Sequence, residues 1–190
     1  MRGFLYLALI AVLSALLTGC VALVAGAGAT AVIVGDDRRK VSVYLEDEDI
    51  ELHGVNRMRE LFPQASVSVG VTSFNHDVLL TGQAPDEATR AKIEATIRTI
   101  PKVHTVYDEI TLSGVPSLAS EANDSAITTE VKTRMTNVKG VGFNQVKVVT
   151  ESGVVYLMGL LTHAEANVAA QVAARTNGVV RVVKVVEYTD

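Results

Sequence analysis

Residues 78–110 read VLLTGQAPDEATRAKIEATIRTIPKVHTVYDEI, and this stretch decides the fold. The apolar run that ends at Gly82 is typical of a buried strand. Pro85-Asp86-Glu87 favours the start of a helix, because proline and acidic residues suit the first helical turn. Pro101 favours the end of that helix and leads by a short turn into more apolar sequence. The stretch therefore predicts a strand, a helix and a second strand.

The second half of the chain repeats the first at a shift of 77 residues, without a gap. The matched positions share residue type and run through the whole unit: Ile50 with Ile127, Arg57 with Arg134, Val78 with Val155, Gly82 with Gly159, Arg98 with Arg175, Val103 with Val180 and Val106 with Val183. A register kept over so many positions indicates an internal duplication. At the paired glycines, Gly82 and Gly159, we expect a strand end with a turn or the close approach of another backbone.

Each unit is predicted to fold as helix, strand, strand, helix, strand (αββαβ). In the second unit Asn123 or Asp124 is the expected N-cap of the first helix, and Thr162 to Glu165 form a capping box for the second. Apolar residues recur on one face of the first helix, at Ile127, Val131, Met135 and Val138. The prediction is an α+β fold with two tandem domains, 41–114 and 124–190. Each would be a small three-stranded mixed sheet packed on two helices, and 115–123 would form the linker.

Residues 1–19 predict a lipoprotein signal peptide, because Arg2 precedes an apolar run that ends in small residues. The sequence LTGC, residues 17–20, resembles a bacterial lipobox, in which the cysteine is acylated and becomes the new N-terminus. Cys20 is the only cysteine, so the chain has no internal disulfide. The alternatives are a buried apolar helix with an incidental cysteine, or an uncleaved membrane span. Residues 20–40 are expected to be a lipidated tether, in which DDRRK at 36–40 marks the return to water.

The composition, 48% hydrophobic and 20% charged, is that of a globular protein, and the net charge of −4 argues against a nucleic-acid binder. GxSxG, HExxH and CxxC motifs do not occur. The four histidines, His53, His76, His104 and His163, are scattered over different predicted elements. The acidic stretch 46–51 is interpreted as the solvated start of a helix rather than a cation site. We therefore predict no enzymatic activity, no cofactor and no metal.

The stretch 78–110 resembles the BON domain, whose marks are a strand with Gly, an Ala-rich helix and a short turn into the last strand. NDSAITTEVKTRM at 123–135 and VYLMGLLTHAEA at 155–166 look like the second domain of outer-membrane lipoproteins with two BON domains, of the DolP type. The resemblance implies a lipid-anchored protein on the periplasmic face of the outer membrane, and Val21 after the cysteine favours that membrane. It also implies a non-enzymatic role in envelope integrity, with anionic phospholipid as the binding partner.

The resemblance places phospholipid binding on the first helix of the second domain. Residues 41–114 contain 6 Lys and Arg against 12 Asp and Glu, whereas 124–190 contain 7 against 6, so the second domain suits an anionic surface better. The candidate lipid-binding residues are Ala126, Thr129, Lys132, Thr133 and Lys139. Ala126 stands where enterobacterial relatives carry a tryptophan. Two alternatives remain open: an ordinary solvated helix, or a protein-binding adaptor that uses a sheet edge or the acidic first domain to hold an envelope partner.

Overall fold

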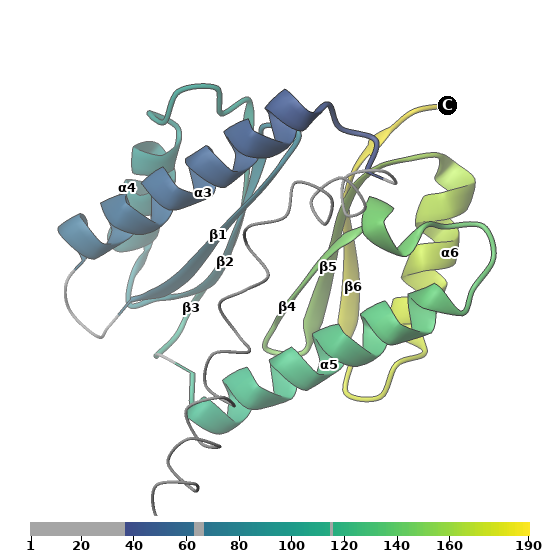
Figure 1. Cartoon of the computed structure of the whole chain (residues 1–190). Helices are drawn as coiled ribbons and strands as arrows, with labels where there is room; N and C mark the ends of the chain where they lie inside the picture. The colour runs from purple at the N-terminus through teal and green to yellow at the C-terminus, as the bar shows by residue number, and fades with distance from the viewer. Residues whose placement is uncertain (1–36, 63–66, 115) are drawn as a thin grey trace, which may run out of the picture. The chain divides into compact units, whose positions relative to one another are not determined.

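The computed structural model describes residues 37–62, 67–114 and 116–190, and it contains two copies of one five-element unit (Figure 1). The first comprises α3 (Val41–Leu61), β1 (Ser68–Phe74), β2 (Asp77–Ala84), α4 (Glu87–Ile97) and β3 (Thr105–Leu112). The second comprises α5 (Leu118–Thr136), a 3₁₀ turn (Phe143–Gln145), β4 (Lys147–Glu151), β5 (Val154–Leu161), α6 (His163–Ala174) and β6 (Arg181–Tyr188). The predicted α+β fold with order αββαβ is confirmed.

Each sheet is mixed, as predicted, and its central strand comes from the middle of the unit. β2 pairs antiparallel with β1 and parallel with β3, and β5 pairs in the same way with β4 and β6. A parallel pair cannot be joined by a tight hairpin, so a helix must cross over between its strands. Residues 78–110 provide that crossover in the first unit, and α4 begins at an Asp86 cap as the sequence indicated.

One face of each sheet is covered by the two helices of its own unit (Figure 1). In the second unit Ile127, Val131 and Met135 of α5 enter this core together with Val155 and Leu157 of β5. The alanines of α6 are buried against the same sheet, because small side chains let a helix lie close to it. The helical face predicted for α5 is therefore confirmed at these three positions.

The opposite faces of the two sheets meet in a third apolar cluster. Phe74 and Leu79 of the first unit pack there with Tyr156, Met158 and Val185 of the second. As a result, β2 and β5 are buried on both faces. This explains why VLL and VVYLM are continuous apolar runs rather than alternating ones.

The paired glycines lie within β2 and β5 rather than at strand ends. At each of them another segment of the backbone packs so closely that a side chain would not fit. Gly82 has a φ of 118°, and a Cβ on it would collide with the carbonyl oxygen of Ser68. A Cβ on Gly159 would lie 2.7 Å from the carbonyl oxygen of Gln145. The expected close approach of another backbone is thus confirmed, and the expected strand ends are not.

The duplication is not free of gaps, and the alignment of the last strands was wrong by one residue. The backbone N–H of His104 donates to the His76 carbonyl, and Val180 donates to Gly153 in the same way. His76 and Gly153 are 77 positions apart, but His104 and Val180 are 76 apart. The first unit has one more residue between β2 and α4, because Ala84 and Leu161 end equivalent strands 77 positions apart whereas the N-caps Asp86 and Thr162 are 76 apart. Consequently Val106, which pairs with Val78, corresponds to Val182, which pairs with Val155.

The first helix of the second unit starts earlier than predicted. Ser117 is its N-cap and accepts a hydrogen bond from the Ser120 N–H, so 118–123, expected as linker, are helical. Asp124, expected as a cap, lies inside α5 and is 8% exposed. The prediction failed because an aspartate favours a helix N-terminus but can also serve as a buried acceptor for a neighbouring segment.

One buried aspartate in each unit ties the first helix to the turn between the first two strands. Asp124 accepts hydrogen bonds from the backbone N–H groups of Ser152 (2.7 Å) and Gly153 (2.8 Å). Asp47, its equivalent, is 1% exposed and accepts from the N–H groups of Asn75 and His76 at 2.8 Å each. Because carboxylate oxygens form strong bonds with backbone donors, these aspartates fix the helix against the sheet.

Replacing Asp124 by alanine should therefore destabilise the protein strongly. The variant leaves two turn N–H groups without their acceptor, and we expect a loss of about 2–3 kcal/mol in the free energy of unfolding. Urea unfolding followed by circular dichroism measures it. Asn123→Ala, at the exposed neighbouring position, is the control and should change stability by less than about 0.5 kcal/mol. Equal midpoints for the two variants would contradict the role given to Asp124.

Candidate functional site

The outer face of α5 carries four of the five residues predicted to bind lipid. Ala126, Thr129 and Thr133 are exposed, and Lys132 is half-buried. Ile127 and the other buried residues of α5 occupy one face of the helix. The candidate residues lie between them in the sequence and therefore project from the side away from the sheet. Lys139 is also exposed but follows the end of the helix, in the turn before the 3₁₀ segment. The structure therefore brings the four helical residues together and places Lys139 beyond the end of that face.

The two threonines of this face are engaged with their own helix. Thr129 Oγ1 donates to the Ser125 carbonyl at 2.9 Å, and Thr133 Oγ1 donates to the Thr129 carbonyl at 2.8 Å. Such bonds satisfy the hydroxyl groups locally. The outer face of α5 thus offers small side chains and the Lys132 ammonium, and neither of these two threonine hydroxyls is held ready for a ligand.

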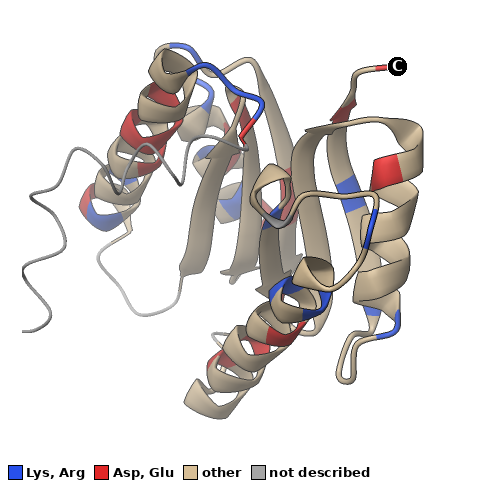
Figure 2. Ribbon diagram, turned by 45° about the vertical axis from the view of Figure 1, so that its right-hand side comes forward, with Lys and Arg blue, Asp and Glu red and all other residues tan. Residues whose placement is uncertain are grey.

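Charge along α5 is uneven, with cations toward its C-terminal end (Figure 2). Arg134 is paired with Glu130 at 2.6 Å, four residues earlier. Within the described part of the chain, neither Lys132 nor Lys139 forms an ion pair. These two ammonium groups are the cations near α5 that remain available to an anionic surface.

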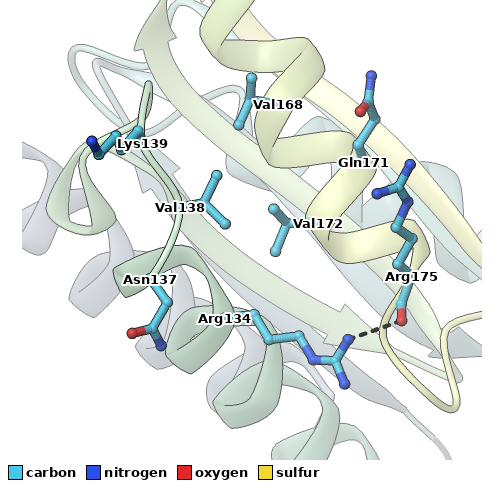
Figure 3. Close-up of a pocket in the computed structure, with 8 residues that line it drawn as sticks. All are labelled: Arg134, Asn137, Val138, Lys139, Val168, Gln171, Val172 and Arg175. Carbon is cyan, nitrogen blue, oxygen red and sulfur yellow. Dashed lines mark hydrogen bonds between the residues drawn. The ribbon is translucent and has the colours of Figure 1, made fainter.

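A pocket of about 490 Å³ lies between the C-terminal end of α5 and one side of α6 (Figure 3). Val138, Val168 and Val172 supply its apolar surface. Its polar residues are Arg134, Asn137, Lys139, Gln171 and Arg175. The sequence analysis did not identify the contribution of α6, and its match of Arg98 with Arg175 was out of register by one residue, because Thr99 is the structural equivalent of Arg175. Only the packing of α6 beside α5 shows that these residues share a pocket.

The acidic stretch 46–51 is not a solvated helix start, which corrects the sequence interpretation. α3 begins at Val41, so the stretch lies in its middle. Glu46 binds His76 and Lys102, each at 2.7 Å, and Glu51 binds Lys147 of the second unit at 2.5 Å. In the described residues no group of three or more His, Cys, Asp and Glu side chains is arranged to hold a metal ion. The acidic residues serve mainly as structural ion-pair partners.

Arg38 and Arg39 attach the end of the predicted tether to both units. The Arg38 guanidinium forms two hydrogen bonds with Glu165 at the start of α6, at 2.8 and 2.6 Å, and one with the Leu160 carbonyl. Arg39 is buried, binds Asp47 at 2.8 Å and lies over the ring of Phe74. DDRRK was therefore wrongly interpreted as a simple return to water. The signal peptide, Cys20 and residues 20–36 lie outside the described residues.

The contact with Arg38 changes the ionisation of Glu165. Hydrogen bonds from Arg38 are the main cause that lowers its pKa to about 2, and those from Thr162 act in the same direction. Glu165 is also the last residue of the predicted capping box, which is confirmed. The same carboxylate thus caps α6 and holds the segment that precedes α3.

Glu165→Gln should loosen this attachment and keep the cap, because glutamine also serves in a capping box. The folded-state pKa lies below the ordinary value of 4.5, so the ion pair stabilises fully above that value and is lost as the pH falls toward 2. We expect the variant to be about 1 kcal/mol less stable at pH 7 and equal to the wild type near pH 2, in urea melts. Faster tryptic cleavage after Arg38 at pH 7 should accompany the change. An unchanged stability difference across this pH range would contradict the assignment.

In the described ranges no helix is both long enough and apolar enough to cross a membrane. The BON-domain family model matches residues 56–114 and 123–190. These two segments correspond to the two copies of the five-element unit, from within the first helix of the first copy. The family match therefore covers both units seen in the structure.

Named relatives agree with the family match. The outer membrane lipoprotein DolP of Haemophilus influenzae is 37% identical over 175 residues, which cover 92% of this chain and 91% of the relative. A 21 kDa hemolysin of Actinobacillus pleuropneumoniae is 31% identical, covering 80% and 79%. A solved C-terminal domain of CdsD, a type III secretion protein of Chlamydia trachomatis, is 14% identical with a TM-score of 0.30, covering 73% and 97%, and adds nothing to the assignment. The chain thus belongs to the BON-domain family, as a two-domain outer-membrane lipoprotein of the DolP type.

Proposed function

We propose that the protein binds the anionic phospholipid surface of the outer membrane through the outer face of α5, from the periplasmic side, and thereby supports envelope integrity without catalysis. The observation that carries the proposal is the outer face of α5 with its adjoining turn. This surface presents Lys132 and Lys139 without ion-pair partners in the described residues, beside the small side chains of Ala126, Thr129 and Thr133.

Electrostatics favours the second domain over the first for this contact. The first domain has twice as many acidic as basic residues, so an anionic surface repels it. A cation close to an anionic membrane surface contributes about 1 kcal/mol. Two such cations give weak binding by themselves, but an anchored domain stays at a high local concentration near the lipid.

The contact is mainly electrostatic in this chain because Ala126 has no aromatic ring to insert among headgroups. Ile127 is buried in the core of the second domain and is not available for insertion either. Binding should therefore weaken as salt shortens the Debye length from about 10 Å at 0.1 M to about 3 Å at 1 M.

We further propose that Cys20 carries the lipid anchor after removal of the signal peptide 1–19. The tether 20–40, whose Arg38 and Arg39 pack on the two units, would then connect the membrane to BON domain 1 (41–114), and the short segment that ends at the Ser117 cap of α5 would connect it to BON domain 2. A cysteine with several acyl chains gives an effectively stable anchor, since each buried CH₂ contributes about 0.8 kcal/mol.

Charge reversal at α5 tests the lipid proposal. The fragment 37–190, which contains all three apolar clusters, should sediment with vesicles of anionic lipid at low salt but not with zwitterionic vesicles. Lys132→Glu combined with Lys139→Glu should abolish sedimentation and leave the circular dichroism spectrum and urea midpoint unchanged. Ala126→Trp should strengthen binding and make it less sensitive to salt.

Lys92→Glu, a single charge reversal on α4 of the first domain, is the control and should leave vesicle binding nearly unchanged, whereas Lys132→Glu alone should weaken it clearly. If the wild-type fragment ignores anionic vesicles at low salt and Ala126→Trp does not restore binding, the lipid proposal is wrong.

A separate variant tests the anchor. Cys20→Ser removes the only thiol, so the protein should stay unlipidated and either leave the membrane fraction or accumulate as the precursor. Fractionation and the apparent mass of the processed chain measure this. Normal membrane fractionation of the variant would contradict the anchor, and if the variant also kept residues 1–19 the apolar run would be a membrane span.

A further inference from the structure

The pocket between α5 and α6 has the character of a binding site for an anion that carries an apolar group. Val138 and Val172 face one another at its centre, with Val168 beside them (Figure 3). Arg134, Lys139 and Arg175 supply three cations, and no aspartate or glutamate lines the pocket. Asn137 and Gln171 add two neutral amides on opposite walls.

The arginine at one end of this pocket is held in place before any ligand arrives. Arg134 Nε donates to Glu130 at 2.6 Å, and Nη1 donates to the Arg175 carbonyl at 3.1 Å across the gap between the helices. The guanidinium of Arg134 is thus fixed by its Nε and Nη1 groups, while its Nη2 group has no partner in the described ranges and remains free to donate to a ligand. The side chains of Lys139 and Arg175 make no ion pair among the described residues.

The first domain is an internal comparison for this pocket. The shift of 77 residues holds through the first helices, so Arg57 and Glu60 stand where the second domain has Arg134 and Asn137. The shift is 76 between α4 and α6, because Asp86 and Thr162 are their equivalent N-caps. Ala95 and Thr99 therefore stand where the second domain has Gln171 and Arg175. The second domain thus has an amide in place of an acid on its first helix, and it gains an amide and a cation beside it from its second helix.

We propose that this pocket binds the C-terminal end of a partner protein, with its free carboxylate at the cations and its last, apolar side chain on the valines. A guanidinium matches a carboxylate through two parallel hydrogen bonds, and Arg175 is placed to form them. The inference goes beyond the proposed lipid contact, because it uses α6 and the end of α5 rather than the outer face of α5; Lys139 alone belongs to both surfaces.

The two amides favour a peptide over a lipid headgroup. Asn and Gln side chains each offer a donor and an acceptor, which match the C=O and N–H of a peptide group. The phosphodiester group itself offers acceptors alone, so beside it only the hydroxyl or ammonium donors at the far end of a headgroup could reach the amide oxygens. The pocket volume of about 490 Å³ suits the last one or two residues of a chain rather than a longer segment.

Fluorescence anisotropy with the full chain in neutral-detergent micelles tests the proposal. The probe is a fluorescein-labelled peptide that ends in Ala-Val-Leu with a free carboxylate, and the comparison is the same peptide with a C-terminal amide. We expect saturable binding of the free acid and at least tenfold weaker binding of the amide, because the amide removes the charge that the arginines recognise.

Two variants locate the site. Arg175→Ala should weaken binding of the free acid about tenfold, while the backbone carbonyl that accepts from Arg134 remains. Asn137→Glu introduces the acid that the first domain has at the equivalent position, and in combination with Gln171→Glu it should abolish binding by repelling the carboxylate. The urea midpoint should stay close to that of the wild type, because both side chains are exposed. Lys132→Ala, on the outer face of α5, is the control and should leave peptide binding unchanged.

The outcomes separate this proposal from the lipid proposal. Peptide binding that depends on Arg175 but not on Lys132 supports the pocket, whether or not vesicles bind. Equal binding of the free acid and the amide overturns it, as does full binding by the Asn137→Glu, Gln171→Glu variant. Displacement of the peptide by lower concentrations of dihexanoyl-phosphatidylglycerol than of unlabelled peptide also overturns it and assigns the pocket to lipid.

Discussion

The central strand of each sheet is buried on both faces, and the rest of the structure depends on this constraint. β2 and β5 lie between their own helices on one side and the other sheet on the other. A strand in that position must be apolar throughout, and its neighbours must approach closely, which explains the glycines within β2 and β5. Two small domains thereby share one apolar layer, which compensates for the limited core that either could form alone.

Polar contacts at the rim of the shared layer join the same two units. Lys147 binds Glu51, Gln83 donates to Glu151, and Asn75 donates to Glu187. Arg38 and Arg39 add a second connection, because adjacent residues attach to different units. The described part of the chain is therefore held together by packing and ion pairs, not by the short connection between β3 and α5 alone. A stable scaffold of this kind keeps the outer face of α5 and the α5–α6 pocket in fixed geometry.

The duplication has preserved the structural residues and changed the surface ones. Asp47 and Asp124 perform the same task in the two units, and so do the paired glycines. In contrast, the exposed Glu60 and Thr99 of the first unit correspond to Asn137 and Arg175 in the second. Burial constrains the first group, because an unpaired N–H or a backbone collision costs stability, whereas exposed positions are free to acquire a binding role.

The sequence by itself determined the duplication, the order of elements, the core face of α5 and the caps of α4 and α6, because these depend on local periodicity and turn chemistry. It misplaced the start of α5 and the register of the last strand. Asp124 fits a cap pattern, but its carboxylate accepts hydrogen bonds from a turn that is distant in the sequence. The one residue inserted in a turn of the first unit leaves no local signal. The tertiary structure alone decided which sheet faces meet, what Arg38 and Arg39 bind, and that Arg175 of α6 lies beside Arg134 of α5. Contacts between residues far apart in the chain depend on packing, which no local pattern encodes.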